Sequence, residues 1–383
     1  MNADVLSRVR RRLVDTGTSP HRPALAAMVR ADSGGLAGHG QLLGLVRETE
    51  WELSGAGLLE PLLRAPETTD VLVNAPDSVW VDQGSGLRRV AVRFPHEAAV
   101  RSLAQRLAAL AGRRLDDASP WVDAALPDGT RLHAVLPPVA VGGTCLSLRT
   151  FRAKGFTLAE LDRAGTLMRG AAGLVEQLIG ARVAFLVSGG TGSGKTTLLG
   201  ALLGLIDSTE RLVLVEDAAE LRTAHPHVVR LTARPPNIEG AGGVSLRDLV
   251  RQALRMRPDR LVVGEVRGAE VVELLTALNT GHPGSAGTLH ANSASELPAR
   301  LEALGALGQL ERHALHSQVA AALQVALHLA RLRDGRRVLA EIAVFRRHRE
   351  RVQVVPAWRH DAGPVDGWPE LARLLDLSGG REP

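Results

Sequence analysis

The sequence predicts an α/β protein with two domains: a larger C-terminal domain built on a parallel sheet, and a smaller α+β domain before it. The chain has 383 residues and a hydrophobic content of 45%, which is enough material for two cores. Beyond residue 171, apolar runs alternate with helical patterns, which is typical of parallel strands joined by helices. A glycine-rich turn after the first run has the strand-turn-helix context of a phosphate-binding loop.

The order of these patterns divides the chain into five segments. Residues 1–50 are polar and glycine-rich, so we expect a partly flexible N-terminal extension. Residues 51–153 are expected to form the first domain, and residues 154–170 a linker. The second domain is expected to span 171–350, and residues 351–383 to form a C-terminal tail that is ordered in part.

The extension and the first domain combine short helices with short strands. Asp4 to Val14 and Ala24 to Val29 could be short helices, followed by a flexible stretch at Ser33 to Gly40. Glu97 to Ala111 has apolar residues at helical spacing, whereas Leu115 to Ala125 is expected to be irregular. Strands are expected at Val71–Val73, Val79–Val81, Arg89–Phe94, Arg131–Leu136 and Thr144–Leu148.

The linker and the second domain carry stronger local signals. Thr157 and Glu160 have the spacing of a capping box, which predicts the start of a short helix. Asp334-Gly335 lies between two apolar runs and predicts a hairpin of Leu323–Arg331 with Val338–Arg346. Parallel strands are expected at Val183–Val187, Leu212–Val215, Val228–Leu231, Leu261–Val263 and Gly287–His290.

The glycine-rich turn has the residue types that hold a phosphate chain. Its glycines let several backbone N–H groups converge on an anion, and the following helix N-terminus adds positive charge. Lys195 can reach the β- and γ-phosphates of a nucleotide, and the Thr196 hydroxyl can ligate Mg²⁺. The chain has only one other lysine, Lys154, and arginine cannot replace a compact ammonium in such a cradle. The candidate nucleotide-binding residues are Gly189, Gly190, Thr191, Gly192, Ser193, Gly194, Lys195, Thr196 and Thr197.

Carboxylates follow two of the predicted strands. Glu216, Asp217 and Glu220 come after the strand at Leu212–Val215, where they either face the site or decorate a helix N-terminus. Glu265 ends the next apolar strand, and Gly264 stands where many such ATPases carry Asp. Glu265 is therefore expected to act on the Mg²⁺ shell or on the attacking water.

Histidines and arginines complete the candidate site. Arg267 could position Glu265 or contact phosphate, and His290 could donate a hydrogen bond to the γ-phosphate. His282 and His290 bracket a glycine-rich strand but are too few to form a metal site. Arginines of the first domain, notably Arg131 and Arg149, could stabilise the charge that develops in phosphoryl transfer.

The composition limits the partners and the compartment. The net charge of +5 indicates either an anionic partner or a solvated arginine-rich surface. Aromatic residues make up only 3% of the chain, with no tyrosine, so direct binding of nucleic acid is not expected. The single cysteine, Cys145, excludes an internal disulfide and fits a reducing cytoplasm. The N-terminus has no signal-peptide pattern, and the apolar stretch at Val319–Ala330 is too short to span a bilayer, so any membrane association is expected to be peripheral.

Taken together, these motifs resemble the type II/IV secretion-system ATPases, also called traffic ATPases. The resemblance is greatest to the CpaF-like branch that serves Tad-type pilus assembly, and it runs from about Leu58 to Phe345. The family's Gly-Glu ending of the Walker-B strand matches Gly264-Glu265. The motifs that carry it are the phosphate loop Gly189–Thr197, the aspartate box Val215–Leu221, the Walker-B stretch Leu254–Glu270 and the histidine box Thr280–Ser293, with Asp70–Asn74, Gly112–Asp117 and Asp128–Leu132 in the first domain.

The resemblance implies a RecA-like P-loop NTPase domain behind a smaller α+β domain, with ATP and Mg²⁺ bound between them. It implies that Glu216 is the water-activating base with support from Glu220, and that Arg131 and Arg149 contact the γ-phosphate. Glu265 would serve the Mg²⁺ water shell, and His282 and His290 would be the histidine-box residues.

The resemblance also implies partners. Family members are homo-hexameric rings on the cytoplasmic face of an inner-membrane assembly, where they act on a platform protein. Many pilus-assembly relatives carry a four-cysteine zinc module, which a chain with Cys145 alone cannot form. Two alternatives stay open: a conjugal DNA-transfer ATPase, and a nucleotide-switch ring scaffold that does not hydrolyse ATP. The sequence specifies neither the cargo nor the direction of any filament movement.

Overall fold

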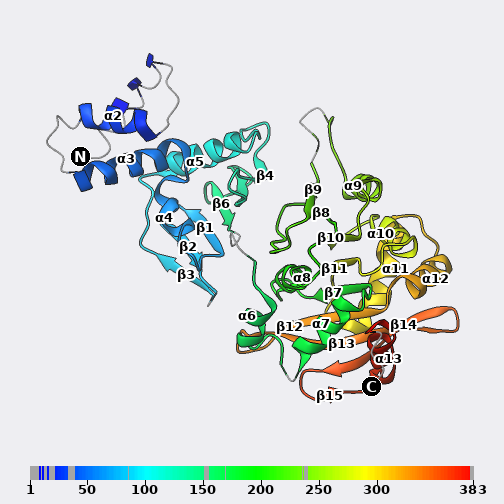
Figure 1. Ribbon diagram of the computed structural model, residues 1–383. Helices are drawn as coiled ribbons and strands as arrows, with labels where there is room; N and C mark the ends of the chain where they lie inside the picture. The colour runs from blue at the N-terminus through cyan, green and yellow to red at the C-terminus, as the bar shows by residue number, and fades with distance from the viewer. Residues whose placement is uncertain are drawn as a thin grey trace. The chain divides into compact units, whose positions relative to one another are not determined.

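The computed structural model comprises two compact units, Met1–Phe151 and Arg152–Pro383, and each is described by itself (Figure 1). The residues that the structure describes are 8–9, 11–12, 15–16, 22–32, 39–84, 86–150, 155–168, 170–234, 236 and 240–379. No helix among these residues is both long and apolar enough to cross a membrane.

An antiparallel sheet of six strands is the centre of the first unit, in the order β3-β2-β1-β6-β5-β4. Helix α5 (Glu97–Leu110) packs Val100, Leu103 and Leu107 onto this sheet. The first hairpin and this helix are confirmed as the sequence predicted them. The strands are β1 Asp70–Ala75, β2 Ser78–Asp82, β3 Leu87–Val90, β4 Trp121–Ala125, β5 Arg131–Val135 and β6 Cys145–Arg149.

Two helices precede this sheet and pack on each other. They are α2 (Arg22–Asp32) and α3 (His39–Ser54), which bury a small apolar cluster of Leu25, Val29, Leu42 and Val46. A 3₁₀ turn, η1 (Gly57–Leu59), and α4 (Glu60–Leu63) lead from α3 to the first strand. The sequence predicted a short helix within α2 but not α3. Most of the helix expected at 4–14 and most of the joint expected at 33–40 lie outside the described residues.

A nine-stranded mixed sheet is the centre of the second unit, in the order β15-β14-β13-β12-β7-β11-β10-β8-β9. The strands from β12 to β9 in this order are parallel, and β13, β14 and β15 extend the sheet with antiparallel pairs. The bounds are β7 Phe185–Gly189, β8 Leu212–Glu216, β9 Val228–Thr232, β10 Arg260–Val266, β11 Ala286–His290, β12 Val325–Arg331, β13 Arg337–His348, β14 Arg351–Arg359 and β15 Gly363–Pro364. The predicted parallel strands and the Asp334-Gly335 hairpin are confirmed.

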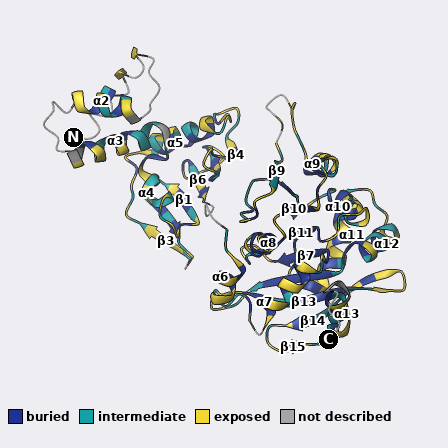
Figure 2. Cartoon of the chain, in the orientation of Figure 1, coloured by how far each residue is buried: buried dark blue, intermediate teal, exposed yellow. Residues whose placement is uncertain are grey.

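Helices cover both faces of this sheet, so its central strands are buried (Figure 2). Phe185 and Val187 of β7 point into one core, under α6 (Leu158–Arg163), α7 (Ala171–Gly180), α8 (Lys195–Leu203) and α13 (Trp368–Gly379). Leu186 points into the other core. That core lies under α9 (Leu246–Ala253), α10 (Val271–Asn279), α11 (Leu297–Leu307) and α12 (Arg312–Ala322), with the 3₁₀ turns η2 (Leu254–Met256) and η3 (Ala294–Glu296). The capping box expected at the start of α6 is present, with Thr157 and Glu160 bonded reciprocally.

Two expectations about irregular segments are wrong. The stretch at Leu115–Ala125 ends in a regular strand, β4, which pairs with β5. Residues 351–379 contain β14 and α13 rather than a partly ordered tail, and Trp358 of β14 is only 2% exposed. The physical reason is tertiary: β14 gains backbone partners from β13 and β15, and it is buried by α13 on one face of the sheet and by α12 on the other.

Candidate active site

The phosphate loop connects the end of β7 at Gly189 to the start of α8 at Lys195. Gly192 has a φ of 70° and Gly194 a φ of 98°, conformations that side chains other than glycine rarely adopt. A Cβ on Gly189 would collide with the backbone oxygen of Leu329 and with Ser193 Oγ. These glycines are therefore required by the shape of the loop, and α8 directs its N-terminus at it.

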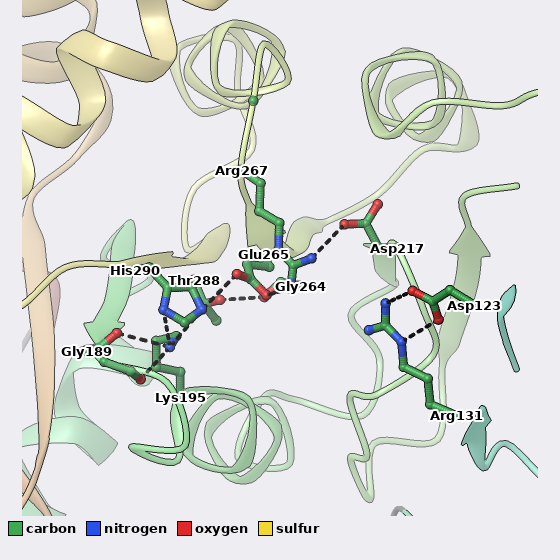
Figure 3. A network of polar contacts seen from close by, with 12 residues as sticks. Asp123, Arg131, Gly189, Lys195, Asp217, Gly264, Glu265, Arg267, Thr288 and His290 are labelled. Atoms are coloured by element: carbon green, nitrogen blue, oxygen red, sulfur yellow. Dashed lines mark hydrogen bonds and ion pairs between the residues drawn. The ribbon is translucent and has the colours of Figure 1, made fainter. Parts of the chain in front are cut away.

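Lys195 lies inside this loop. Its side chain is buried, and Nζ donates hydrogen bonds to the carbonyl oxygens of Gly189 at 3.0 Å and Gly190 at 2.9 Å (Figure 3). Burial lowers the pKa of Lys195 from its usual value, with a further lowering by Arg267 and an opposing effect of Glu265. The ammonium group is thus held at the floor of the loop, where a phosphate chain would enter.

Glu265 and His290 lie next to this lysine. His290 Nε2 is 2.9 Å from Glu265 Oε1, and both ring nitrogens of His290 are 3.4 Å from Lys195 Nζ. Arg267 Nη2 donates to Glu265 Oε2 at 2.5 Å, and its Nη1 is 3.7 Å from Asp217 Oδ2. The chain of contacts from Lys195 to Asp217 is drawn in Figure 3.

The charges of this network favour an ionised Glu265 and a neutral His290. Burial raises the pKa of Glu265, but the hydrogen bond and charge of Arg267, with His290 and Lys195, outweigh it and hold the pKa below its usual value. Burial and then the charge of Lys195 lower the pKa of His290, although Glu265 opposes this. A neutral imidazole has one N–H, and at 2.9 Å from the ionised Glu265 carboxylate Nε2 is the nitrogen that carries it.

Glu216, at the end of β8, is a buried carboxyl with only 3% of its surface exposed. Its Oε1 accepts from the backbone N–H groups of Glu220 at 3.0 Å and Leu221 at 2.7 Å, and its Oε2 is 3.7 Å from Arg230 Nη1. Burial outweighs these interactions and raises the pKa of Glu216 to about 7. A carboxylate with that pKa is suited to accept a proton near neutral pH.

The glycine before Glu265 makes room for Glu216. Strands β8 and β10 are parallel neighbours, with Val215 paired to Val263. A Cβ on Gly264 would lie 2.7 Å from Glu216 Cγ. The carbonyl oxygen of Gly264 also accepts from the buried Thr288 hydroxyl at 2.6 Å. An aspartate at this position could not coexist with the observed Glu216 side chain.

Arg131 and Arg149 lie side by side in the first unit, because they are paired across the antiparallel strands β5 and β6. Arg131 makes a two-pronged ion pair with Asp123, at 3.0 Å and 2.8 Å (Figure 3). Arg149 Nε donates to Asp70 Oδ1 at 3.0 Å. The sheet thus presents two guanidinium groups on one face, each oriented by an aspartate.

Of the remaining expected residues, some lie at the phosphate loop and one does not. Thr196 is half-buried and Thr197 exposed in the first turn of α8, and Glu220 contributes its backbone N–H to Glu216. The structure does not bring His282 to the loop. It precedes β11 at the amino end of the sheet, where its Nδ1 is 3.1 Å from the Ala277 carbonyl oxygen, whereas the loop follows the carboxyl end of β7.

One residue near the loop had no signal in the sequence. Arg337, the first residue of β13, donates from Nε to the Gly192 carbonyl oxygen at 2.8 Å. The contact joins residues 145 positions apart. It depends on β12 pairing with β7, which no local pattern predicts.

The comparisons with known proteins agree with this architecture. Residues 52–355 match the model of the family described as type II/IV secretion system protein. A Mycobacterium tuberculosis (strain H37Rv) protein whose provisional name is conjugal transfer protein Rv3659c is 62% identical over 348 residues, covering 89% of this chain and 98% of that protein. The conjugal transfer protein TrbB of Rhizobium radiobacter is 31% identical, covering 70% of this chain and 81% of TrbB.

Solved structures show the same fold at low sequence identity. The pilus retraction motor PilT, crystallised with ADP, superposes with a TM-score of 0.55 at 20% identity, over 84% of this chain and 86% of PilT. The ATPase DotB of Legionella pneumophila gives a TM-score of 0.53 at 21% identity, covering 73% of this chain and 77% of DotB. The predicted fold, a RecA-like domain behind a smaller N-terminal domain, is confirmed. The chain belongs to the type II/IV secretion system protein family.

Proposed function

We propose that this chain is an ATPase motor that hydrolyses ATP to ADP and phosphate to power secretion or Tad-like pilus assembly. The observation that carries the proposal is the group of ionisable residues at the carboxyl ends of the parallel strands. Lys195 lies inside the phosphate loop, Glu265 and His290 contact it or each other, and Glu216 ends β8, the neighbour of the strand that carries Glu265. These are the groups that phosphoryl transfer to water requires.

The loop fits a nucleotide on its own geometry. Ser193 Oγ is buried and has no hydrogen-bond partner in the described part of the chain, so an uncommitted hydroxyl lies among the loop's glycines. Lys195 Nζ donates to neutral carbonyl oxygens and forms no salt bridge with any residue that the structure describes, which leaves its charge to be matched by phosphate. Thr196 and Glu265 would hold Mg²⁺, Glu265 partly through water, and the ion would neutralise charge on the β- and γ-phosphates.

In the proposed mechanism Glu216 is the base. Its carboxylate accepts a proton from the attacking water, while its backbone bond to Glu220 fixes its orientation. Lys195 and the loop amides bind the phosphates, and His290 would donate a hydrogen bond to the γ-phosphate when its N–H leaves Glu265. Arg267 keeps Glu265 ionised and oriented through its 2.5 Å bond.

The proposed mechanism also uses two arginines of the first unit. Arg131 and Arg149 would contact the γ-phosphate and stabilise the charge that develops as its bond to ADP breaks. Their aspartate partners would orient the two guanidinium groups before ATP binds.

The proposed assembly follows from family membership. We expect a homo-hexameric ring on the cytoplasmic face of the inner membrane, acting on a membrane platform protein. Conjugal DNA transfer is a second candidate, because Rv3659c and TrbB carry that description in their names. Stimulation of ATP turnover by DNA would favour this candidate, and the absence of stimulation would favour a protein cargo.

The test is steady-state ATP turnover by purified full-length protein. Lys195→Ala is expected to abolish both nucleotide binding and turnover. Arg131→Ala and Arg149→Ala should each lower kcat about 100-fold or more while nucleotide is still bound. Arg89→Ala is the matched control, because this arginine of the same sheet pairs with Asp77 and should leave kcat unchanged. Undiminished turnover in the Lys195 variant would refute the site, and nucleotide binding without turnover by the wild type would favour a switch.

A further inference from the structure

The turn between β12 and β13 projects beyond the same edge of the sheet as the phosphate loop. Strand β12 is parallel to β7, with Leu329 paired to Gly189, the last residue before the loop. Strand β12 continues for two residues to Arg331, and β13 returns opposite it at Arg337. This register places the start of β13 next to the loop.

Arg337 lies against the glycines of the loop. Nε donates to the Gly192 carbonyl oxygen at 2.8 Å, and Cδ lies 3.5 Å from the position that a Cβ on Gly194 would occupy. Its neighbour Arg336 is engaged elsewhere, since Nε donates to Asp334 Oδ2 at 2.7 Å. Within the described ranges, no carboxylate is paired with Arg337, so its charge is directed at the loop peptide.

The bond acts on a peptide group that also carries a donor for phosphate. In a trans peptide the C=O of Gly192 and the N–H of Ser193 point in opposite directions. A cation on the oxygen polarises the peptide and makes its N–H a stronger donor. That N–H is only loosely engaged, at 3.4 Å from the Gly190 carbonyl oxygen, and backbone N–H groups are what phosphate loops offer to a nucleotide.

We propose that Arg337 is a positioning residue that raises the affinity of the phosphate loop for nucleotide by fixing and polarising the Gly192–Ser193 peptide. The inference rests on the proposed function for its ligand, the phosphate chain of ATP or ADP. It adds to nucleotide affinity a contribution from the β12–β13 hairpin, which is distant from the loop in sequence. Arg337 is exposed, so its replacement leaves the hydrophobic core intact.

The experiment compares Arg337→Ala with Arg336→Ala, its neighbour on the same hairpin, and with Arg337→Lys. Equilibrium binding of ADP with a fluorescent ribose label is measured for the full-length variants. We expect Arg337→Ala to raise Kd about fivefold or more, Arg336→Ala to stay within about twofold, and Arg337→Lys to recover part of the affinity. The KM for ATP should rise with little change in kcat, and the unfolding midpoint without nucleotide should not move.

Two results would overturn the proposal. One is a Kd for Arg337→Ala within about twofold of the wild type. The other is an equal loss in Arg336→Ala, which would assign the effect to the general charge of the hairpin. Failure of the proposed function would look different: the wild type would bind labelled ADP but release no phosphate from ATP, and the binding comparison would still decide the role of Arg337. A wild type that binds no nucleotide would overturn both.

Discussion

Glu216 and Gly264 lie on neighbouring strands, and the missing side chain of Gly264 leaves the space that Glu216 fills. We predict that Gly264→Ala lowers the free energy of unfolding by about 1–3 kcal/mol, because the added methyl group overpacks a buried site. Gly173→Ala in α7 is the matched control, since no heavy atom lies within 4 Å of its added Cβ. It should stabilise the helix by about 0.5–1 kcal/mol. Urea unfolding of both variants measures the two free energies of unfolding. Equal changes in the two variants would contradict the prediction that Gly264→Ala overpacks the site.

The raised pKa of Glu216 also makes stability depend on pH. The carboxyl binds its proton more tightly in the folded protein, where the pKa is about 7, than at its ordinary value of 4.5. Its stabilising contribution is therefore complete below about pH 4.5 and is lost as the pH rises through about 7. Relative to Glu216→Gln, the wild type should lose about 3 kcal/mol of unfolding free energy across this window. Urea unfolding at pH 5 and pH 8 measures the difference, and a pH-independent difference would contradict the account.

Individual site residues could be predicted where a local motif specifies them. The spacing of the phosphate loop identified Lys195, and strand-end positions identified Glu216 and Glu265, because parallel strands bring their carboxyl ends to one edge. Arg337 could not be predicted, since its place depends on the register of β12 against β7. His282 and His290 lie at different ends of the sheet, because His282 precedes the first residue of β11 and His290 is its last.

At the scale of elements, the C-terminal segment is part of the second core. Trp358 of β14 is 2% exposed and packs in the same cluster as Phe185 of β7 and Leu371 of α13. We predict that Trp358→Ala destabilises the second unit by about 3–5 kcal/mol, through lost burial and the cavity left behind. Trp121→Ala, at a side chain that is 59% exposed, should change stability by about 0.5 kcal/mol or less. Thermal unfolding of both variants measures these changes in stability. A loss of stability in Trp358→Ala as small as in Trp121→Ala would argue against a structural role for β14.

Elements with a strong local signal were predicted well, and elements that depend on a distant partner were not. The Thr157 capping box and the Asp334-Gly335 turn specify their own conformation within a few residues. Helix α3 buries apolar residues in a cluster with α2, and β14 pairs along its length with β13. The alternating burial of Val352 and Val354 shows that β14 did carry a strand pattern in its sequence.

At the scale of the whole molecule, the proposed catalytic groups come from both units. The second unit holds the phosphate loop, Glu216 and Glu265, whereas the first holds the paired Arg131 and Arg149. Under the proposed function, the loop and the carboxylates of the second unit would bind nucleotide and activate water, and the two arginines would add charge stabilisation in the transition state. Nucleotide binding and hydrolysis should therefore be separable by mutation, with binding governed by the loop and hydrolysis by the base and the arginines.

The most direct test of this account is single-turnover phosphate release from ATP by the wild type and by Glu216→Gln, at ATP concentrations that saturate both. We predict that Glu216→Gln binds ATP with an affinity within about threefold of the wild type but releases phosphate about 100-fold more slowly or worse, because the amide cannot accept the proton of the attacking water. Release at the wild-type rate from Glu216→Gln, with ATP fully bound, would contradict the assignment of the active site.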